Sequence, residues 1–98
     1  MTITKKKNEA ALELALNGRL DTTTAPELEK ELVTALEGVS ELTLDFAGLD
    51  YISSAGLRVL LSAQKTMNKQ GSMKIKNVNE IIMEIFEVTG FSDILTIE

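Results

Sequence analysis

The spacing of apolar residues restricts the fold of this chain most, because the period switches between two and about 3.6 several times. Leu12, Leu14 and Leu16 alternate with Ala11, Glu13 and Ala15, which predicts a strand. A helical apolar stripe follows and stops at Gly38; its members are Ala25, Leu28, Leu32, Ala35 and Leu36. A strand and an amphipathic helix must each bury an apolar face, so the two elements are expected to pack together.

The rest of the chain continues this alternation. Residues 2–7 predict a weak strand, and residues 39–46 predict a strong one. Residues 55–70 predict a helix that ends at Gly71 and directs these side chains inward: Leu57, Leu60, Leu61, Ala63 and Met67. Residues 73–76 form a short strand. Asn79 opens a third helix that carries Ile81, Ile82, Ile85 and Phe86, and residues 94–97 predict a last edge strand.

This order of elements defines the fold class. Helical crossovers make the strands after the opening hairpin parallel, with right-handed connections. We therefore expect an α/β domain with a mixed sheet of about five strands, in which the N-terminal hairpin strand is antiparallel and the rest are parallel, and with three or more helices. The 98 residues form one domain, residues 1–98, because a chain of this length supports one core.

Two local patterns give more detail. Thr24 followed by Glu27 predicts a capping box at the start of the first helix, and Pro26 lies in the first turn, where proline is tolerated. The run Lys5-Lys6-Lys7 predicts an edge strand whose charges discourage pairing with another sheet.

The composition excludes several kinds of chemistry. The chain has no Cys and no His, so it has no thiolate nucleophile, Cys-based metal site or imidazole base. A nucleophile elbow would need glycine at Ile52, and the six glycines are too scattered for a phosphate-binding loop. We expect no enzymatic activity, no cofactor and no metal site.

Charge and hydropathy exclude two further classes. The chain has 15 acidic and 10 basic residues, a net charge of −5, which disfavours nucleic-acid binding. No apolar run reaches the length of a membrane span, so no membrane contact is expected. The first seven residues lack the apolar stretch of a signal peptide, and a cytoplasmic location is expected.

Ser53 and Ser54 lie where a predicted strand meets a predicted helix. The free N–H groups and positive dipole end of such a helix favour an anion, so this position suits a phosphorylated hydroxyl. The structural alternative is that one serine simply caps the helix, since serine is among the best N-cap residues.

Three motifs carry a resemblance to a known family. They are Tyr51-Ile52-Ser53-Ser54-Ala55-Gly56-Leu57, Gly18-Arg19-Leu20-Asp21 with Thr24-Ala25 after it, and Glu84-Ile85-Phe86-Glu87-Val88-Thr89-Gly90-Phe91. They resemble the phosphorylation loop, the turn into the first helix and the closing helix of bacterial anti-sigma factor antagonists, the single-domain members of the STAS superfamily. The resemblance covers nearly the whole chain, in order, and implies a STAS-like fold.

The resemblance also implies a modification site. The phosphoacceptor of the family falls on Ser54, with Ser53 as the alternative. The commonest family pattern has Asp where this chain has Ser53, so two candidate hydroxyls remain and one carboxylate is missing. The partner-binding surface implied by the resemblance comprises Asp21, Thr22, Asp50, Tyr51, Ser53, Ser54, Ala55, Gly56, Arg58 and Val59.

Asp21, Gly56 and Val59 of this surface each have a second interpretation, and Asp45 is a further candidate for phosphorylation. Asp21 could be a turn or Asx cap as well as a partner contact. Gly56 could allow close helix packing or let a kinase approach the hydroxyl. Val59 lies off the inward stripe, and we expect it to be partly exposed, or to contact a partner. Asp45 could be a receiver-type phosphoacceptor, but Asn17-Gly18-Arg19 supplies no acidic pair for magnesium.

The resemblance implies a binding switch. The unphosphorylated protein would bind an anti-sigma factor that is also a serine/threonine kinase, and would release the sigma factor. Phosphorylation would end binding, and a serine phosphatase would restore it. Alternatives are a partner switch with another output, such as secretion, motility or stress signalling, and a small-molecule sensor. We expect a monomer.

Overall fold

The computed structural model describes residues 1–98, and a four-stranded sheet forms its centre. The elements in chain order are β1 (Thr2–Asn8), β2 (Ala11–Leu20), α1 (Ala25–Ala35), β3 (Glu41–Ile52), α2 (Ser54–Gln70), β4 (Ser72–Lys76), α3 (Glu80–Thr89) and the 3₁₀ turn η1 (Phe91–Asp93). The strand order is β1-β2-β3-β4. The β1–β2 pair is antiparallel, and the other two pairs are parallel, which confirms the predicted mixed α/β sheet.

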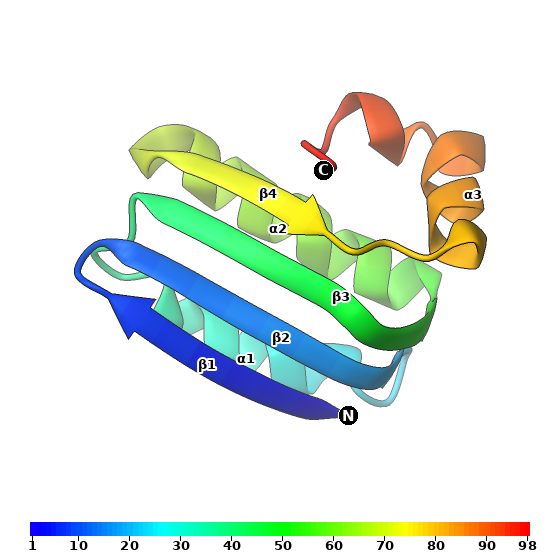
Figure 1. The fold of residues 1–98 in the computed structure, drawn as a ribbon, viewed down its shortest axis with the longest axis horizontal. Helices are drawn as coiled ribbons and strands as arrows, with labels where there is room; N and C mark the ends of the chain where they lie inside the picture. The colour runs from blue at the N-terminus through cyan, green and yellow to red at the C-terminus, as the bar shows by residue number, and fades with distance from the viewer.

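Helices α1 and α2 lie together on one face of the sheet, whereas α3 lies at the end of the sheet next to β4 (Figure 1). The alternating leucines explain this layering, because every second residue of β2 and β3 points toward the helices and is buried. These buried strand residues are Leu12, Leu14, Leu16, Leu42, Leu44 and Phe46. The opposite face has no helix over it and carries half-buried polar side chains such as Glu13, Thr43 and Asp45.

The sheet has four strands where about five were expected. The 3₁₀ turn η1 ends directly before the segment predicted as a last strand, residues 94–97, and the helical backbone of Ile94 continues the turn into it. Only Ile97 forms a parallel bridge, with Ile75 of β4. Two backbone hydrogen bonds support this bridge, from Ile75 N–H to the Thr96 carbonyl at 2.9 Å and from Glu98 N–H to the Ile75 carbonyl at 2.8 Å.

Strand β3 is longer than predicted, and this changes the environment of the residues that precede Ser53 and Ser54. The prediction ended it at residue 46, but it continues to Ile52 beside the last residues of β2. Two register shifts, each with an extra residue on β3, fall between Asp45 and Gly48 and between Leu49 and Tyr51, and the strand pairs with β2 again after each. The predicted loop before Ser53 is therefore part of the sheet.

The lysine-rich strand β1 lies at the edge of the sheet, as predicted. Lys5 Nζ lies 2.8 Å from Glu31 Oε1 on α1. Because the remaining lysines keep charge on this edge, the strand resists pairing with another sheet.

Candidate functional site

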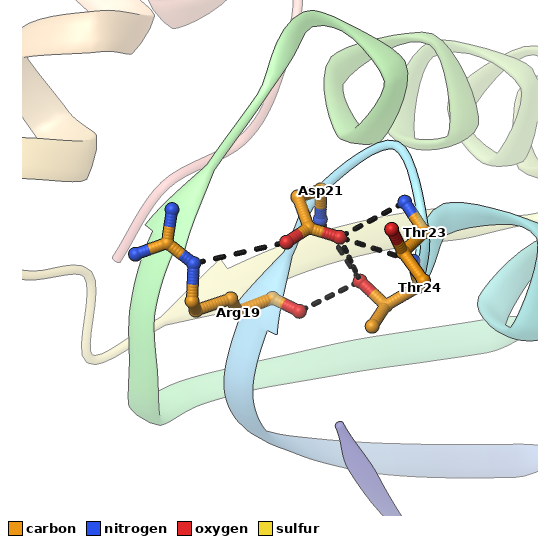
Figure 2. A network of polar contacts seen from close by, with 4 residues as sticks. All are labelled: Arg19, Asp21, Thr23 and Thr24. Carbon is orange, nitrogen blue, oxygen red and sulfur yellow. Dashed lines mark hydrogen bonds and ion pairs between the residues drawn. The ribbon is translucent and has the colours of Figure 1, made fainter.

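The turn between β2 and α1 is held by a carboxylate. Asp21 Oδ1 accepts hydrogen bonds from the backbone N–H groups of Thr23 at 3.0 Å and Thr24 at 3.1 Å (Figure 2). Thr24 Oγ1 accepts from the Asp21 N–H at 2.9 Å and donates to the Arg19 carbonyl at 2.7 Å. The predicted capping box is wrong, because Thr24 makes no side-chain cap of α1. The structural interpretation of Asp21 is confirmed: it closes the turn.

Electrostatics at this turn follow from the same contacts. The Thr24 backbone N–H lowers the pKa of Asp21 most, and the N–H of Thr23 and the Thr24 hydroxyl add to this effect. The Arg19 guanidinium also lowers it, with Nε 3.7 Å from Asp21 Oδ2. Asp21 is therefore held in its charged form, with Oδ1 directed into the turn and Oδ2 toward Arg19.

The Arg19 side chain also lies over the ring of Tyr51, the aromatic residue that precedes Ile52 and the two serines. Arg19 of β2 pairs with Tyr51 of β3, and its guanidinium carbon lies 4.6 Å from the centre of the Tyr51 ring. This is a cation–π distance. The sequence did not single out Arg19, although it lies inside the motif that identified Asp21. Its position between Tyr51 and Asp21 joins two predicted site residues.

The two serines have different environments. Ser53 alone separates β3 from α2, in an extended conformation, and its N–H donates to the Leu20 carbonyl at 2.9 Å. Its Oγ is buried and has no hydrogen-bond partner, so Ser53 occupies the cap position of α2 without capping it. Ser54, the first residue of α2, is exposed. Of the two candidate hydroxyl-bearing residues, Ser54 is the accessible one.

Gly56 is a packing residue in the first turn of α2. A Cβ atom built there would lie 2.8 Å from Ile52 Cγ1, 2.8 Å from Leu20 Cγ and 3.0 Å from the Leu20 carbonyl oxygen. The absence of a side chain lets α2 approach the ends of β2 and β3. Close packing accounts for Gly56.

The sequence predicted that Val59 is partly exposed. This prediction is wrong, because Val59 is buried, with 4% of its surface accessible. It lies where α2 approaches α1, and it contributes to two adjacent hollows between these helices. The apolar stripe within α2 does not include Val59, which is buried because α1 lies against this part of α2. Any partner contact of Val59 must be made at the floor of such a hollow.

A small cleft of about 170 Å³ lies between the first turns of α1 and α2. Four of the predicted site residues line it, namely Thr22, Ala55, Arg58 and Val59. The residues that the sequence analysis did not propose for this site are Ala25, Pro26 and Glu29. The spacing of Ala25 and Glu29, one helical turn apart on α1, is the only local signal that could have paired them. The cleft therefore lies next to the exposed first turn of α2.

The predicted site residue Asp50 and the receiver-type candidate Asp45 both lie away from this cleft. Asp50 is exposed within β3, and it does not line the cleft. Asp45 is near the end of the strand predicted over residues 39–46, but it lies inside the longer β3. Its Oδ1 accepts from Asn77 Nδ2 at 3.0 Å and from the Ala47 N–H at 3.0 Å, and these bonds lower its pKa, Asn77 most. Asp45 therefore joins β3 to the residue after β4 and does not belong to the site.

The site contains hydroxyl, carboxylate and guanidinium groups at the end of the sheet where α2 begins. No group of three or more acidic, His or Cys side chains is arranged to hold a metal ion. None of the helices combines the length and the apolar character needed to cross a membrane. The chemical feature that remains is an exposed hydroxyl at a helix N-terminus, next to a cleft.

Comparison with known proteins identifies the family. The profile of the family described as "Mlab, STAS domain" matches residues 3–96. The anti-sigma-B factor antagonist of Bacillus subtilis is 33% identical over 93 residues, which are 94% of this chain and 85% of that protein. BtrV of Bordetella bronchiseptica, a candidate anti-sigma factor antagonist, is 35% identical over 99% of this chain and 85% of its own length.

Solved structures show the same fold. Unphosphorylated SpoIIAA, an anti-sigma factor antagonist, aligns with a TM-score of 0.78 at 16% identity, over 99% of this chain and 87% of that chain. An anti-sigma factor antagonist of Mycobacterium paratuberculosis aligns with a TM-score of 0.88 at 18% identity, over 98% of this chain and 83% of that chain. The family match and the fold agree: this chain belongs to the anti-sigma factor antagonists of the STAS superfamily.

Proposed function

We propose that this chain is a phosphorylation-controlled binding protein. Its unphosphorylated form binds an anti-sigma factor that is also a serine/threonine kinase, and thereby releases the sigma factor. Phosphorylation of Ser54 ends this binding, and a serine phosphatase restores it. Magnesium and ATP belong to the kinase, because this chain acts as its substrate and not as an enzyme.

The contrast between the two serines carries the proposal. Ser54 is exposed at the start of α2, whereas the Oγ of Ser53 is buried. A kinase must bring the γ-phosphate in line with the attacking oxygen, which requires an accessible hydroxyl. SpoIIAA, which shares this fold, has been solved in phosphorylated and unphosphorylated forms, which supports the same type of control here.

The surroundings of Ser54 suit a switch at an interface. A phosphate adds about −1.5 to −2 charges at neutral pH. The first turn of α2 has no side-chain cap, so free N–H groups and the helix dipole can accommodate that charge within the domain. A partner surface shaped for a neutral hydroxyl has no such compensation, and it would lose affinity.

The experiment begins with a pull-down of the tagged protein from its source cell. The recovered kinase is purified and incubated with this protein and Mg-ATP, and tandem mass spectrometry is applied to the tryptic peptide that ends at Arg58. One phosphate on Ser54 is the expected result. Phosphate on Ser53 alone would overturn the choice of acceptor, and phosphate on Asp45 would overturn the whole mechanism.

The same pull-down separates two outputs of the switch. Recovery of a kinase that also binds a sigma factor supports release of sigma. A kinase without a sigma factor would instead assign the chain to another partner-switching pathway. Recovery of no kinase would overturn the proposed function.

A further inference from the structure

Helix α3 has one face that packs on the core. Asn79 caps the helix by accepting the Ile82 N–H at 2.8 Å, and Gly90 ends it in the left-handed conformation. Ile82 and Phe86 are buried, and the Phe86 ring lies 6.4 Å from that of Phe46 on β3. Ile82 and Phe86, with the half-buried Met83 and Ile85 packed against the same core, fix the helix on the domain.

The neighbouring face of α3 is also apolar, and the domain leaves much of it exposed. Ile81 is 61% exposed and Val88 is 82% exposed, with the half-buried Ile85 between them. Their spacing of i, i+4 and i+7 places the three side chains in one row, which we name the α3 stripe. Because Ile81 and Val88 are not buried by their own domain, this apolar face of α3 is available to a partner.

Charge indicates what kind of surface would cover the α3 stripe. Helix α3 carries Glu80, Glu84 and Glu87 and no basic residue, and none of the three glutamates forms an ion pair. Helical geometry places Glu84 beside Ile81 and Val88. A second copy of this chain would bring like charges together, so the complementary surface is apolar with Lys or Arg beside it.

The position of α3 connects the stripe to the site. Asn79 Nδ2 donates to the Leu49 carbonyl at 3.0 Å, which fastens the start of α3 to β3 three residues before Ile52. In Figure 1, α3 lies at the end of the sheet where β3 ends and α2 begins. A protein that covers Ser54 can therefore reach α3 without crossing the sheet.

We propose that the α3 stripe is a second docking surface for the kinase, and that it contacts an apolar patch flanked by basic side chains. This inference rests on the proposed function. The stripe supplies contact area at a distance from the hydroxyl, so it sets affinity and partner choice, whereas Ser54 sets the state of the switch.

The test uses the purified kinase recovered with the wild-type protein. Val88→Glu and Ile81→Glu put a charge into the stripe, and Glu84→Lys reverses the charge beside it. Val33→Glu on α1 is the matched control, because Val33 is 76% exposed and also helical. Glu37→Lys, which is exposed near the end of α1, matches the charge change of Glu84→Lys. Binding is measured by calorimetric titration, and folding by thermal melts.

We expect each α3 variant to raise the Kd for the kinase at least about tenfold while it melts like the wild type. The two control variants, Val33→Glu and Glu37→Lys, should bind like the wild type. The α3 variants should also slow phosphorylation of Ser54 at low substrate concentration and leave the rate at saturation unchanged, because they remove binding and not chemistry.

Three results would overturn the inference. Equal affinity of the α3 variants and the wild type would remove the second surface and leave the proposed function intact. A loss confined to Val33→Glu would move the contact to the 310 Å³ groove between α1 and α2. A wild-type dimer that Val88→Glu dissociates would identify a second copy as the occupant. Failure of the wild type to bind any kinase would instead reject the proposed function.

Discussion

The N–H of Ser53 donates a hydrogen bond of 2.9 Å to the carbonyl oxygen of Leu20. This bond joins the turn that leads into α1 with the turn that leads into α2. Asp21 follows directly on one side and Ser54 on the other, so the carboxylate turn and the exposed serine form one structural unit. Changes in either turn are expected to affect the other.

We expect Ser54→Ala to keep binding the kinase, because it cannot be phosphorylated. We expect Ser54→Asp to bind poorly while it remains folded. The added charge would have to be desolvated at the interface, at a cost of several kcal/mol. Since about 1.4 kcal/mol changes affinity tenfold, the loss should be at least about tenfold. Calorimetric titration against the kinase, with thermal melts alongside, measures both quantities. Equal affinities would reject a charge-based switch, and a collapsed melt for Ser54→Asp would indicate unfolding.

Gly56→Ala should destabilise the domain although alanine is the better helix former. Overpacking against Leu20 and Ile52 costs about 1–3 kcal/mol, whereas the gain in helix propensity is at most about 1 kcal/mol. The nearby carbonyl of Leu20 cannot move without weakening its bond to Ser53. Urea denaturation measures the change, with Ser62→Ala on the exposed side of α2 as the control. A more stable Gly56→Ala variant would show that the helix can shift outward.

Asp21 should stabilise the fold in a pH-dependent manner. Its pKa is lowered below the ordinary value of 3.8 by the Thr24 N–H first, so folding favours the charged form. The contribution is fully present above that value and is lost as the pH falls through the lower pKa of the folded state. The difference in melting temperature between wild type and Asp21→Asn should therefore be constant near neutral pH and shrink below about pH 4.

The control for this experiment is Asp50→Asn, which removes an equal charge from an exposed position of β3. Titration of the Asp21 carboxyl by NMR gives its pKa directly. A value at or above 3.8 would contradict the role of the turn hydrogen bonds.

Gln70→Ala should weaken the far end of the helix pair. Gln70 Nε2 donates to the carbonyl of Leu36 at 2.6 Å and to the carbonyl of Val39 at 2.5 Å, which fastens the last turn of α2 to the segment after α1. The loss of two such bonds should cost about 1–2 kcal/mol. Chemical denaturation tests this, and Thr66→Ala, one turn earlier and exposed, is the comparison. No difference between the two variants would mean that water replaces the amide.

The sequence predicts the order of elements because the signals are local. Leu12, Leu14 and Leu16 define β2 by alternation alone, and Asn79 marks the start of α3 by its capping chemistry. The predicted start of α2 differs from the observed one by a single residue. Each of these features depends on neighbours within about one or two helical turns.

The errors arise where distant segments decide the result. Val59 is buried because α1 lies against α2, and no pattern within α2 contains that information. Strand β3 continues through Gly48 because β2 offers pairing partners on the other side of two bulges. At the start of α1, the carboxylate of Asp21 accepts the Thr24 N–H, which the capping box assigned to the side chain of Glu27. The resemblance placed the acceptor on Ser54, and the burial of the Ser53 Oγ adds an argument for that choice that the sequence does not contain.

The connection between β3 and α2 consists of one residue, Ser53. A segment this short has almost no freedom to rearrange, so Ser54 is presented in a single geometry that the whole sheet maintains. A kinase that binds it need not order a flexible chain, and little conformational entropy is lost on docking. The kinase would then recognise a folded surface and not a linear motif, and a short synthetic peptide containing both serines would be a poor substrate.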